Sequence, residues 1–322
     1  MKFYPLKFKP ILKERLWGGT KLKDTFGKPS TSAITGESWE LSTVKGDVSV
    51  VANGELANTS LQELIEKYPE ELLGKSVVER FGTEFPILIK FIDAKQDLSI
   101  QLHPNDELAQ ERHNSFGKTE MWYIMDADPG AELIVGFNKD VSKEEYSKSL
   151  ENDTLLDLLN YEKVKEGDTF FINTGKIHAI GAGVLLAEIQ QTSDVTYRVF
   201  DFNRKDKDGN LRELHTELAL DAIDYKNKDD FKVEYPKGMN SVNSMVDCPY
   251  FKTNFLDLDK DLKFETKNRD SFTIYMCVDG EALIENEFGK VSLEKGETTL
   301  LPAITEEIAI KTTGVKLLEV TI

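Results

Sequence analysis

The close spacing of short apolar runs constrains the fold of this chain more than any other feature. The runs are alternating or continuously apolar, and Gly, Asn, Asp or Pro separates each from the next. Many short strands at such intervals are typical of a β-sandwich or barrel. We therefore expect a mainly β protein. The expected strands lie at 46–52, 85–94, 98–103, 120–127, 131–137, 167–173, 184–191, 196–202, 271–278, 281–286 and 315–322.

Helical periodicity occurs in only three segments, so helices form a small part of the expected fold. Residues 60–74 have apolar residues at helical spacing until Pro69 interrupts them. Residues 142–159 begin with the letters SKEE, which fit a capping box. Residues 215–223 form a short third candidate. None of the three carries an obvious reactive group, and we expect them to pack against the β-core.

Composition and charge disfavour several classes of protein. The formal net charge is −17, and nucleic acid is therefore not an expected partner, because a phosphate backbone needs a basic surface. No apolar run is long enough for a membrane-spanning helix, and the N-terminus lacks a signal-peptide core. Cys248 and Cys277 lie far apart without CxxC spacing, and we expect two reduced core thiols. We expect a cytoplasmic protein that is a monomer or a weak homodimer.

Two segments, 167–175 and 296–303, repeat one pattern. Each has a Gly, an acidic residue, a short β-run and a turn residue six positions after the Gly. The unit resembles the turn–strand–turn of a cupin, which is a jelly-roll β-barrel. No histidine lies beyond residue 215, so only the first of two such barrels can bind metal through imidazole. We predict a catalytic cupin domain with helical insertions over 1–235, a polar linker near 226–240, and a metal-free, cupin-like β-domain over 236–322.

Three segments of the first domain carry residues that suit a metal ion. Gln101 and His103 lie two positions apart in an expected strand, so their side chains project to the same face. Glu120 begins an apolar strand, where a carboxylate has no packing value unless it is paired or ligating. His178 follows a glycine-rich turn and begins an apolar run, so its ring can face the barrel interior.

Gln101, His103, Glu120 and His178 together form a mixed nitrogen and oxygen ligand set. Any one of them alone is more simply explained as a hydrogen-bonded core residue, but their order and spacing favour a metal site. The set suits zinc, and it would also accept cobalt, manganese, nickel or iron. We expect one Zn²⁺ per chain. A glutamine in place of a third histidine leaves room for water or substrate oxygens, which is typical of Lewis-acid chemistry.

Six longer motifs follow one another along the chain: RLWGGTKL, TGESWELS, LIKFIDAKQDLSIQLHPND, GKTEMWYI, NTGKIHAIGAG and LLAEIQQTSDVTYRVFDFNR. In these motifs the chain resembles the type I mannose-6-phosphate isomerases (phosphomannose isomerases), in the short form found in Gram-positive bacteria. The likeness runs nearly end to end. It implies a metal-dependent enzyme that interconverts mannose 6-phosphate and fructose 6-phosphate through an enediol or enediolate, and hence a small sugar phosphate as partner.

The resemblance also implies roles for individual residues. It assigns metal ligation to the same four side chains and active-site positions to Arg198 and Glu188. From its place near Glu120, Lys118 is expected to join them in catalysis. Ser99 and Lys118 match positions implied in phosphate binding. Glu37 matches the acidic residue that the family places near the pocket. We therefore expect Ser99, Lys118 and Glu37 to contact the substrate.

An anionic substrate needs a local basic lining in a protein this acidic. Arg198 supplies a planar, permanent cation that could stabilise the enediolate. Lys118 lies two residues before Glu120, so in a regular strand it projects toward the same region. The sequence leaves open whether Lys90 or Lys95 joins this lining.

One position departs from the family pattern. The longer members carry a histidine before the Lys-x-Glu unit, sometimes proposed as the proton-transfer base, and Gly117 stands there in this chain. Glu188, Lys118, Glu37 and a metal-bound hydroxide remain candidates for the base. A metal-binding cupin could also be an iron oxygenase or a non-catalytic phosphosugar-binding protein, and both alternatives stay open at this point.

Overall fold

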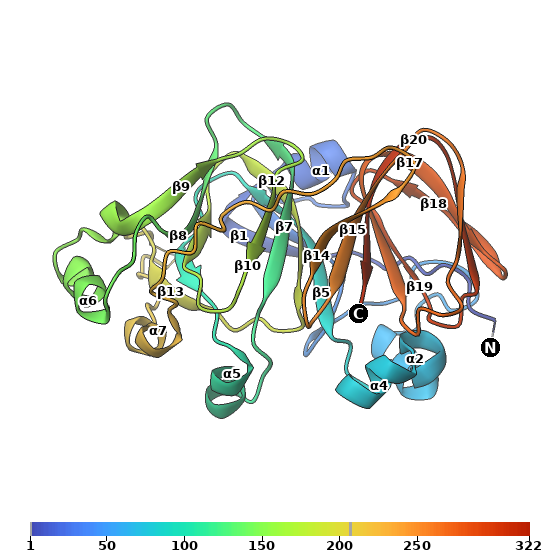
Figure 1. Ribbon diagram of the computed structural model, residues 1–322, viewed down its shortest axis with the longest axis horizontal. Helices are drawn as coiled ribbons and strands as arrows, with labels where there is room; N and C mark the ends of the chain where they lie inside the picture. Colours follow the sequence, from blue (N-terminus) through green and yellow to red (C-terminus); the bar gives the residue numbers. More distant parts are fainter. Residues whose placement is uncertain (1, 206–207) are drawn as a thin grey trace.

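The computed structural model describes residues 2–205 and 208–322, and strands predominate in it (Figure 1). The strands are β1 (Ile11–Gly19), β2 (Thr35–Leu41), β3 (Thr43–Val44), β4 (Asp47–Val48), β5 (Ile87–Ala94), β6 (Ile100–Leu102), β7 (Glu120–Ala127), β8 (Glu132–Phe137), β9 (Leu159–Lys163), β10 (Thr169–Ile172), β11 (His178–Ile180), β12 (Val184–Gln191), β13 (Tyr197–Phe200), β14 (Val242–Asp247), β15 (Lys252–Leu258), β16 (Leu262–Glu265), β17 (Thr273–Asn286), β18 (Gly289–Glu294), β19 (Thr298–Leu301) and β20 (Glu307–Thr321). The helices are α1 (Lys21–Phe26), α2 (Leu61–Lys67), α3 (Pro69–Leu73), α4 (Lys75–Phe81), α5 (Asp106–His113), α6 (Lys143–Glu151), α7 (Thr216–Ala222) and the 3₁₀ turn η1 (Leu155–Leu158).

Two antiparallel sheets face each other and form the first barrel. One has the strand order β1-β2-β5-β12-β7-β10, and the other has the order β13-β6-β11-β8-β9. Apolar side chains from both sheets meet in one buried cluster, for example Trp122 and Ile124 of β7 with Leu133 and Val135 of β8. The jelly-roll architecture expected from the strand spacing is present in this half of the molecule.

The six-stranded sheet is buried on both of its faces. In β12, Leu186 points into the first barrel, whereas Leu185 and Ala187 pack with residues of the C-terminal sheet. Such double burial explains why β5 and β12 are almost continuously apolar. Because side chains alternate along a strand, every second residue faces the barrel interior. Polar residues on that inner face include Glu37 of β2, Lys90 of β5, Glu120 of β7 and Glu188 of β12.

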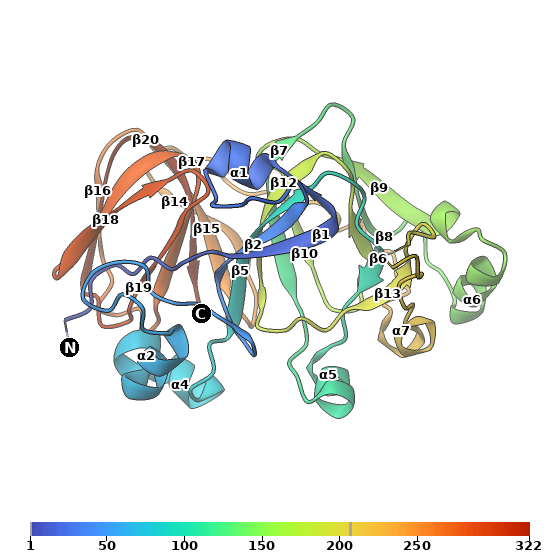
Figure 2. The ribbon, with the colours of Figure 1, turned by 180° about the vertical axis from the view of Figure 1, so that it is seen from behind.

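The C-terminal strands β14 to β20 form a second barrel at one end of the molecule (Figures 1 and 2). The long strands β17 and β20 run through most of it, and its interior holds an apolar cluster of its own. The start of the chain also packs here, because Leu6 and Leu300 exchange two backbone hydrogen bonds of 2.8 and 2.9 Å. Helices α2 to α4 lie beside the same barrel, where Ala303 N donates to Leu72 O at 3.0 Å.

The two copies of the glycine–acid repeat occupy equivalent places in the two barrels. Gly167 N donates to Ile124 O, and Ile124 N donates to Asp168 O, both at 2.9 Å. In the second barrel, Gly296 N donates to Cys277 O at 2.8 Å, and Cys277 N donates to Glu297 O at 2.9 Å. Gly167 and Gly296 have φ of 82° and 84°, a left-handed conformation that favours glycine. The predicted internal repeat is therefore confirmed.

Several details differ from the sequence-based expectations. The strand expected at 46–52 is reduced to the two-residue β4 and isolated bridges, and those expected at 271–278 and 281–286 are one strand, β17. Gly280, at φ 73°, lies within this strand between two irregularities in its pairing with β20. The helix expected at 142–159 ends at Glu151, since Asp153 adopts a left-handed conformation. Strands β1, β2 and β9 and helices α1, α4 and α5 were not expected, and β14, β15, β16 and β18 were expected only as part of a C-terminal β-domain.

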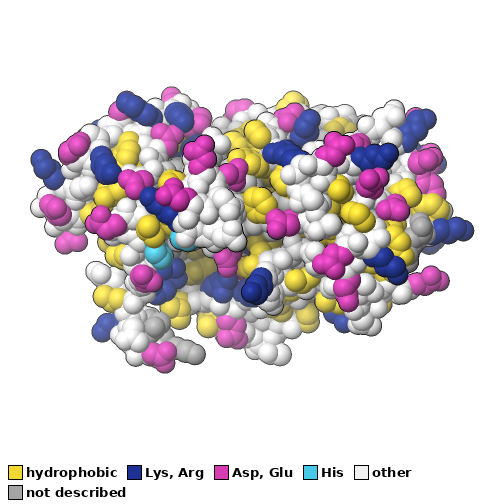
Figure 3. All heavy atoms as spheres, turned by 90° about the horizontal axis from the view of Figure 1, so that it is seen from below, with side chains coloured by type: hydrophobic (Ala, Val, Ile, Leu, Met, Phe, Trp, Pro, Cys, Tyr) yellow, Lys and Arg dark blue, Asp and Glu magenta, His cyan; other side chains and the backbone are white. Residues whose placement is uncertain are grey.

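The boundary between the two predicted domains stays a prediction. Residues 223–238 contain no helix or strand, but they pack along the first barrel, where Val233 N donates to Thr169 O at 2.8 Å. Both cysteines are free; Cys277 is buried, whereas Cys248 is only half-buried. No helix in the described part of the chain is long and apolar enough to cross a membrane. Acidic and basic side chains are interspersed on the face shown in Figure 3.

Candidate active site

Three of the four predicted metal ligands converge inside the first barrel. His103 follows β6, Glu120 begins β7, and His178 begins β11. One ligand atom from each of these side chains lies within 4.8 Å of the others. All three residues are at most 1% exposed. The strands bring them together because β11 pairs with β6, with His178 opposite Gln101. Strand β7 belongs to the facing six-stranded sheet.

Both imidazoles are oriented so that one ring nitrogen faces Glu120. His103 Nδ1 lies 2.9 Å from Val195 O and His178 Nδ1 lies 2.8 Å from Lys176 O, so each Nδ1 carries the proton and donates. Each Nε2 therefore presents a lone pair, and each lies 3.5 Å from a Glu120 carboxylate oxygen. Two ligand atoms bound tetrahedrally to zinc are separated by about 3.4 Å, given bond lengths of about 2.1 Å. The observed separations fit a shared cation.

The polar atoms at the centre of this cluster lack ordinary partners. Both carboxylate oxygens of Glu120 and Nε2 of His178 are buried without a hydrogen-bond partner among the described residues. Such orphaned polar atoms are costly unless something binds them. Lys118 Nζ supplies part of the compensation, since it lies 3.2 Å from His103 Nε2 and 3.3 Å from Glu120 Oε2. The donor set and its burial fit a divalent metal ion.

Electrostatics in the cluster keep the imidazoles neutral. Burial is the main reason why the pKa of His178 falls to about 4, and burial together with Lys118 lowers the pKa of His103 well below its usual value. Burial and then Glu188 raise the pKa of Glu120 to about 7. A neutral imidazole is the form that binds metal, and a nearby cation would favour the ionised carboxylate.

Gln101, the fourth predicted ligand, lies beside this cluster. Its backbone is opposite His178 in the β6–β11 pair, and its side chain lines the same pocket. Ser99 Oγ lies 3.4 Å from Gln101 Oε1 and donates to it. The amide oxygen is thus on the pocket side of the strand. Its role as a ligand stays a prediction.

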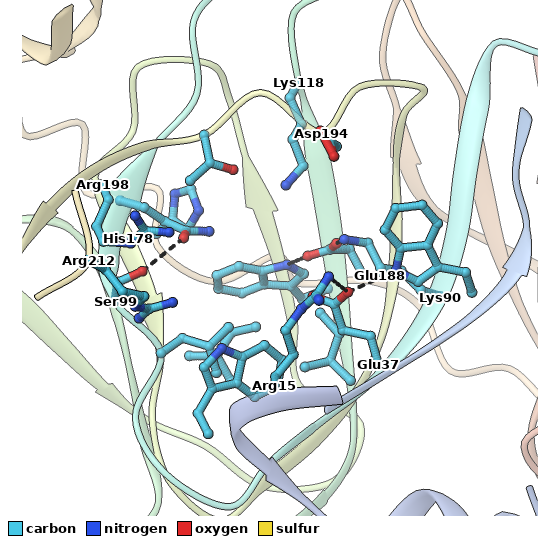
Figure 4. A pocket seen from close by; sticks show the side chains of 18 residues that line it. Arg15, Glu37, Lys90, Ser99, Lys118, His178, Glu188, Asp194, Arg198 and Arg212 are labelled. Atoms are coloured by element: carbon cyan, nitrogen blue, oxygen red, sulfur yellow. Dashed lines mark hydrogen bonds and ion pairs between the residues drawn. The ribbon is translucent and has the colours of Figure 1, made fainter. Parts of the chain in front are cut away.

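A pocket of about 430 Å³ opens beside the cluster (Figure 4). Its lining includes five basic and three acidic side chains, so it is locally basic in a strongly acidic protein. The local cationic lining expected for an anionic substrate is therefore present. The pocket lining contains Gln101 and His178 of the metal cluster, and every residue expected in a catalytic or substrate-binding role: Glu37, Ser99, Lys118, Glu188 and Arg198.

One wall of the pocket is a chain of alternating charges on the six-stranded sheet. Glu188 Oε1 pairs with Lys90 Nζ at 2.7 Å, and its Oε2 accepts a hydrogen bond from Trp122 Nε1 at 2.7 Å. Glu37 Oε2 accepts from Trp39 Nε1 and pairs with an arginine, both at 2.8 Å. Burial opposes ionisation of both carboxylates, but Lys90 together with the other cations and tryptophan donors around them lowers the pKa of each. Lys90 joins the lining, whereas Lys95 is exposed.

The opposite wall carries Arg198 of β13 and Ser99, which lies just before β6. Arg198 is opposite Gln101 in the β6–β13 pair, and its Nη1 donates to Glu213 O at 2.8 Å. Sequence reasoning did not single out Arg15, Asp194 or Arg212, which also line the pocket. Arg15 shares a strand face with Trp17, and this spacing could have revealed it. Arg212 lies in an irregular segment, and no local sequence pattern predicts its place in the pocket.

Gly117, at the position where the longer family members carry a histidine, leaves no room for a Cβ in this chain. A Cβ at this position would lie 2.7 Å from Asp106 N and 2.8 Å from Asn105 C, both backbone atoms at the start of α5. We expect Gly117→Ala to lower the free energy of unfolding by about 1–3 kcal/mol, because the backbone must shift to relieve the overlap. Urea denaturation measures this change.

Gly314→Ala is the matched control for that substitution. A Cβ at Gly314 meets nothing within 4 Å, so its effect should stay within about 0.5 kcal/mol. Equal unfolding curves for Gly117→Ala and the unsubstituted protein would contradict the steric explanation.

The fold and the site define a two-barrel cupin protein with a candidate metal centre in its first barrel. The chain belongs to the type I phosphomannose isomerase family. The family profile "Phosphomannose isomerase type I, catalytic domain" matches residues 6–159, and the profile "Mannose-6-phosphate isomerase, cupin domain" matches residues 241–320. The predicted family and cupin fold class are thereby confirmed.

Individual relatives agree along nearly the whole chain. The mannose-6-phosphate isomerase ManA of Bacillus subtilis (strain 168) is 39% identical over 302 residues, covering 92% of this chain and 93% of that protein. A crystal structure of the mannose 6-phosphate isomerase from Bacillus subtilis superposes with a TM-score of 0.90 at 34% identity, covering 99% of this chain and all of the other. The apo form from Salmonella typhimurium has a TM-score of 0.78 at 19% identity over 98% of both chains, a likeness of fold alone.

Proposed function

We propose that the chain is a mannose-6-phosphate isomerase, which interconverts mannose 6-phosphate and fructose 6-phosphate. The single observation that carries the proposal is the buried His103, Glu120 and His178 cluster at the side of a basic pocket. Family membership and the mannose-6-phosphate isomerase activity for which the Bacillus subtilis relatives are named point to the same reaction. A substrate of this kind matches both the oxygen-binding metal chemistry and the positive lining.

The metal is proposed to be Zn²⁺, one per chain, held by Gln101, His103, Glu120 and His178. Two imidazoles and a carboxylate are typical zinc ligands, and other divalent first-row metals would also fit them. The Nδ1 contacts of both histidines with backbone carbonyls are the outer-shell support that such sites use. Lewis-acid polarisation of the sugar's carbonyl and hydroxyl oxygens is the chemistry that the cation supplies when bound.

Glu188 is the strongest candidate for the base that moves a proton between C2 and C1 of the open-chain sugar. It faces the pocket, and its two oxygens are fixed by Lys90 and Trp122. Lys90, Lys118 and Trp122 together lower the pKa of this carboxyl group despite its burial, so the carboxylate can accept a proton from carbon. Lys118 is less suited to this role because its ammonium lies against Glu120.

Arg198 is proposed to stabilise negative charge that develops on the substrate oxygens. It lies next to Gln101 across the β6–β13 pair, and its Nε is buried without a partner among the described residues. A guanidinium remains charged even in a partly buried site. A preorganised cation beside a developing oxyanion lowers the barrier of such a step.

A coupled assay that detects fructose 6-phosphate formed from mannose 6-phosphate tests the proposed function. We expect turnover by the metal-loaded protein, loss of turnover after chelation, and recovery on addition of Zn²⁺. No turnover by protein that contains metal would contradict the proposal. Oxygen uptake with a candidate substrate would instead favour an iron oxygenase, and binding of mannose 6-phosphate without conversion would favour a non-catalytic phosphosugar-binding protein.

A further inference from the structure

The charges on the two walls of the pocket are not equally balanced. On the six-stranded sheet, Lys90 pairs with Glu188 and Arg15 pairs with Glu37. On the opposite wall, Arg198 and Arg212 both line the pocket. Figure 4 shows them near Ser99 and away from Lys90 and Glu188. The second wall is therefore where an incoming anion would meet more positive charge than the described carboxylates nearby can balance.

A buried carboxylate fixes Arg212 in place. Asp201 is 5% exposed, and its Oδ2 accepts a hydrogen bond from Arg212 Nε at 2.7 Å, while its Oδ1 accepts from Arg212 Nη2. This bidentate arrangement holds the guanidinium plane in one orientation. Asp201 also binds Arg204, through Nε at 3.2 Å and Nη2 at 2.6 Å. One buried carboxylate thus serves two guanidinium groups.

The surroundings of Arg198 show the same excess of positive charge. Its only described side-chain hydrogen bond goes to a backbone carbonyl, that of Glu213, and its Nε is buried without a partner among the described residues. Burial and then Arg212 lower the pKa of Arg198, against the opposing influence of Asp201 and the exposed Glu213. Among the described residues, one buried carboxylate, Asp201, pairs with Arg204 and Arg212. The exposed Glu213 acts on Arg198 only electrostatically through its carboxylate.

We propose that Arg212, positioned by Asp201, receives the phosphate group of the sugar substrate, with the Ser99 hydroxyl beside it. This inference rests on the proposed function and names the residue that makes the site select phosphorylated sugars. A dianionic phosphate matches paired guanidinium donors in both charge and geometry. Arg198, which adjoins Gln101 and Arg212, lies between this phosphate end and the metal ligands. The cavity of about 430 Å³ is large enough for a small ligand that reaches both.

The test compares Arg212→Gln with Arg204→Gln in the metal-loaded protein. Both substitutions remove one guanidinium from Asp201, but only Arg212 lines the pocket. We expect Arg212→Gln to raise KM for mannose 6-phosphate by about 10- to 100-fold with kcat within threefold, since charge-assisted hydrogen bonds to phosphate are lost. We expect Arg204→Gln to change KM less than threefold. Thermal unfolding of both variants shows whether they fold.

A second measurement needs no turnover. It is the dissociation constant of inorganic phosphate, determined by ³¹P NMR titration. The dissociation constant should rise at least tenfold in Arg212→Gln and remain nearly unchanged in Arg204→Gln. An unchanged constant in Arg212→Gln, or an equal increase in both variants, would overturn the proposal. If the unsubstituted protein fails to isomerise mannose 6-phosphate but its phosphate binding still depends on Arg212, the proposed function fails and the phosphate site stands.

Discussion

His178→Ala should leave the protein without bound metal and should lower kcat/KM for mannose 6-phosphate by about 10³-fold or more. The ring supplies one of the two imidazole nitrogens that face Glu120, and its Nε2 has no other partner among the described residues. Lewis-acid stabilisation of substrate oxygens is worth several kcal/mol, and each 1.36 kcal/mol corresponds to about a tenfold rate. Metal analysis of the purified variant and the coupled assay measure the two effects.

His113→Ala is the matched control, because this histidine is exposed at the end of α5 and its Nε2 contacts Tyr197 Oη at 2.9 Å, outside the cluster. It should keep its metal and its activity within about threefold. His178→Gln keeps a polar side chain at the buried position. It therefore distinguishes the loss of a metal ligand from misfolding of the protein. Full turnover by metal-free His178→Ala protein would refute the proposed chemistry.

Glu188→Gln should keep the metal but lose about 10²- to 10⁴-fold in kcat, which is the usual contribution of a positioned general base. The amide preserves the size of the side chain and can still accept from Trp122, yet it cannot take up a proton from carbon. Metal content, kcat and KM together distinguish this outcome from a loss of the metal site.

Glu37→Gln provides the comparison for that variant. Glu37 and Glu188 each bind a tryptophan Nε1, and both act electrostatically on Lys90, so either substitution removes one negative charge from the same lysine. Both variants should lose some stability, because a buried charge loses a partner. Only Glu188→Gln should lose most of its kcat, whereas Glu37→Gln should mainly raise KM. A kcat for Glu188→Gln within a few-fold of the unsubstituted enzyme would exclude it as the base.

Unbroken apolar runs, which result from burial on both faces of a sheet, explain which strands could be predicted. Strands β7 and β12 begin and end at the predicted residues, because each contains an unbroken apolar run (MWYIM in β7, VLLA in β12) and is bounded by turns. All seven residues of β2 are buried, yet it was missed, since it contains Glu37, Ser38 and Glu40. These polar residues are satisfied by tertiary partners, such as Lys28, which pairs with Glu40 at 2.7 Å. A buried strand whose polar residues leave no unbroken apolar run, as in β2, therefore escapes the pattern that identifies strands.

The candidate site was predictable where local spacing controls side-chain direction. Gln101 and His103 lie two apart on one strand face, and Glu120 begins an apolar strand, so simple periodicity pointed to them. Arg212 could not be found in this way, because it reaches the pocket from an irregular segment and its orientation depends on Asp201, eleven residues earlier. Contacts of that kind depend on the folded chain rather than on any local pattern.

The most direct measurement of the central claim is an anomalous difference map, recorded on both sides of the zinc absorption edge, from crystals of the active protein. We predict one strong peak per chain, about 2.0–2.2 Å from Nε2 of His103, Nε2 of His178 and a carboxylate oxygen of Glu120, with the Gln101 amide oxygen as the fourth protein ligand. A peak at another place in the chain, or no metal at these side chains in crystals of fully active enzyme, would contradict the account.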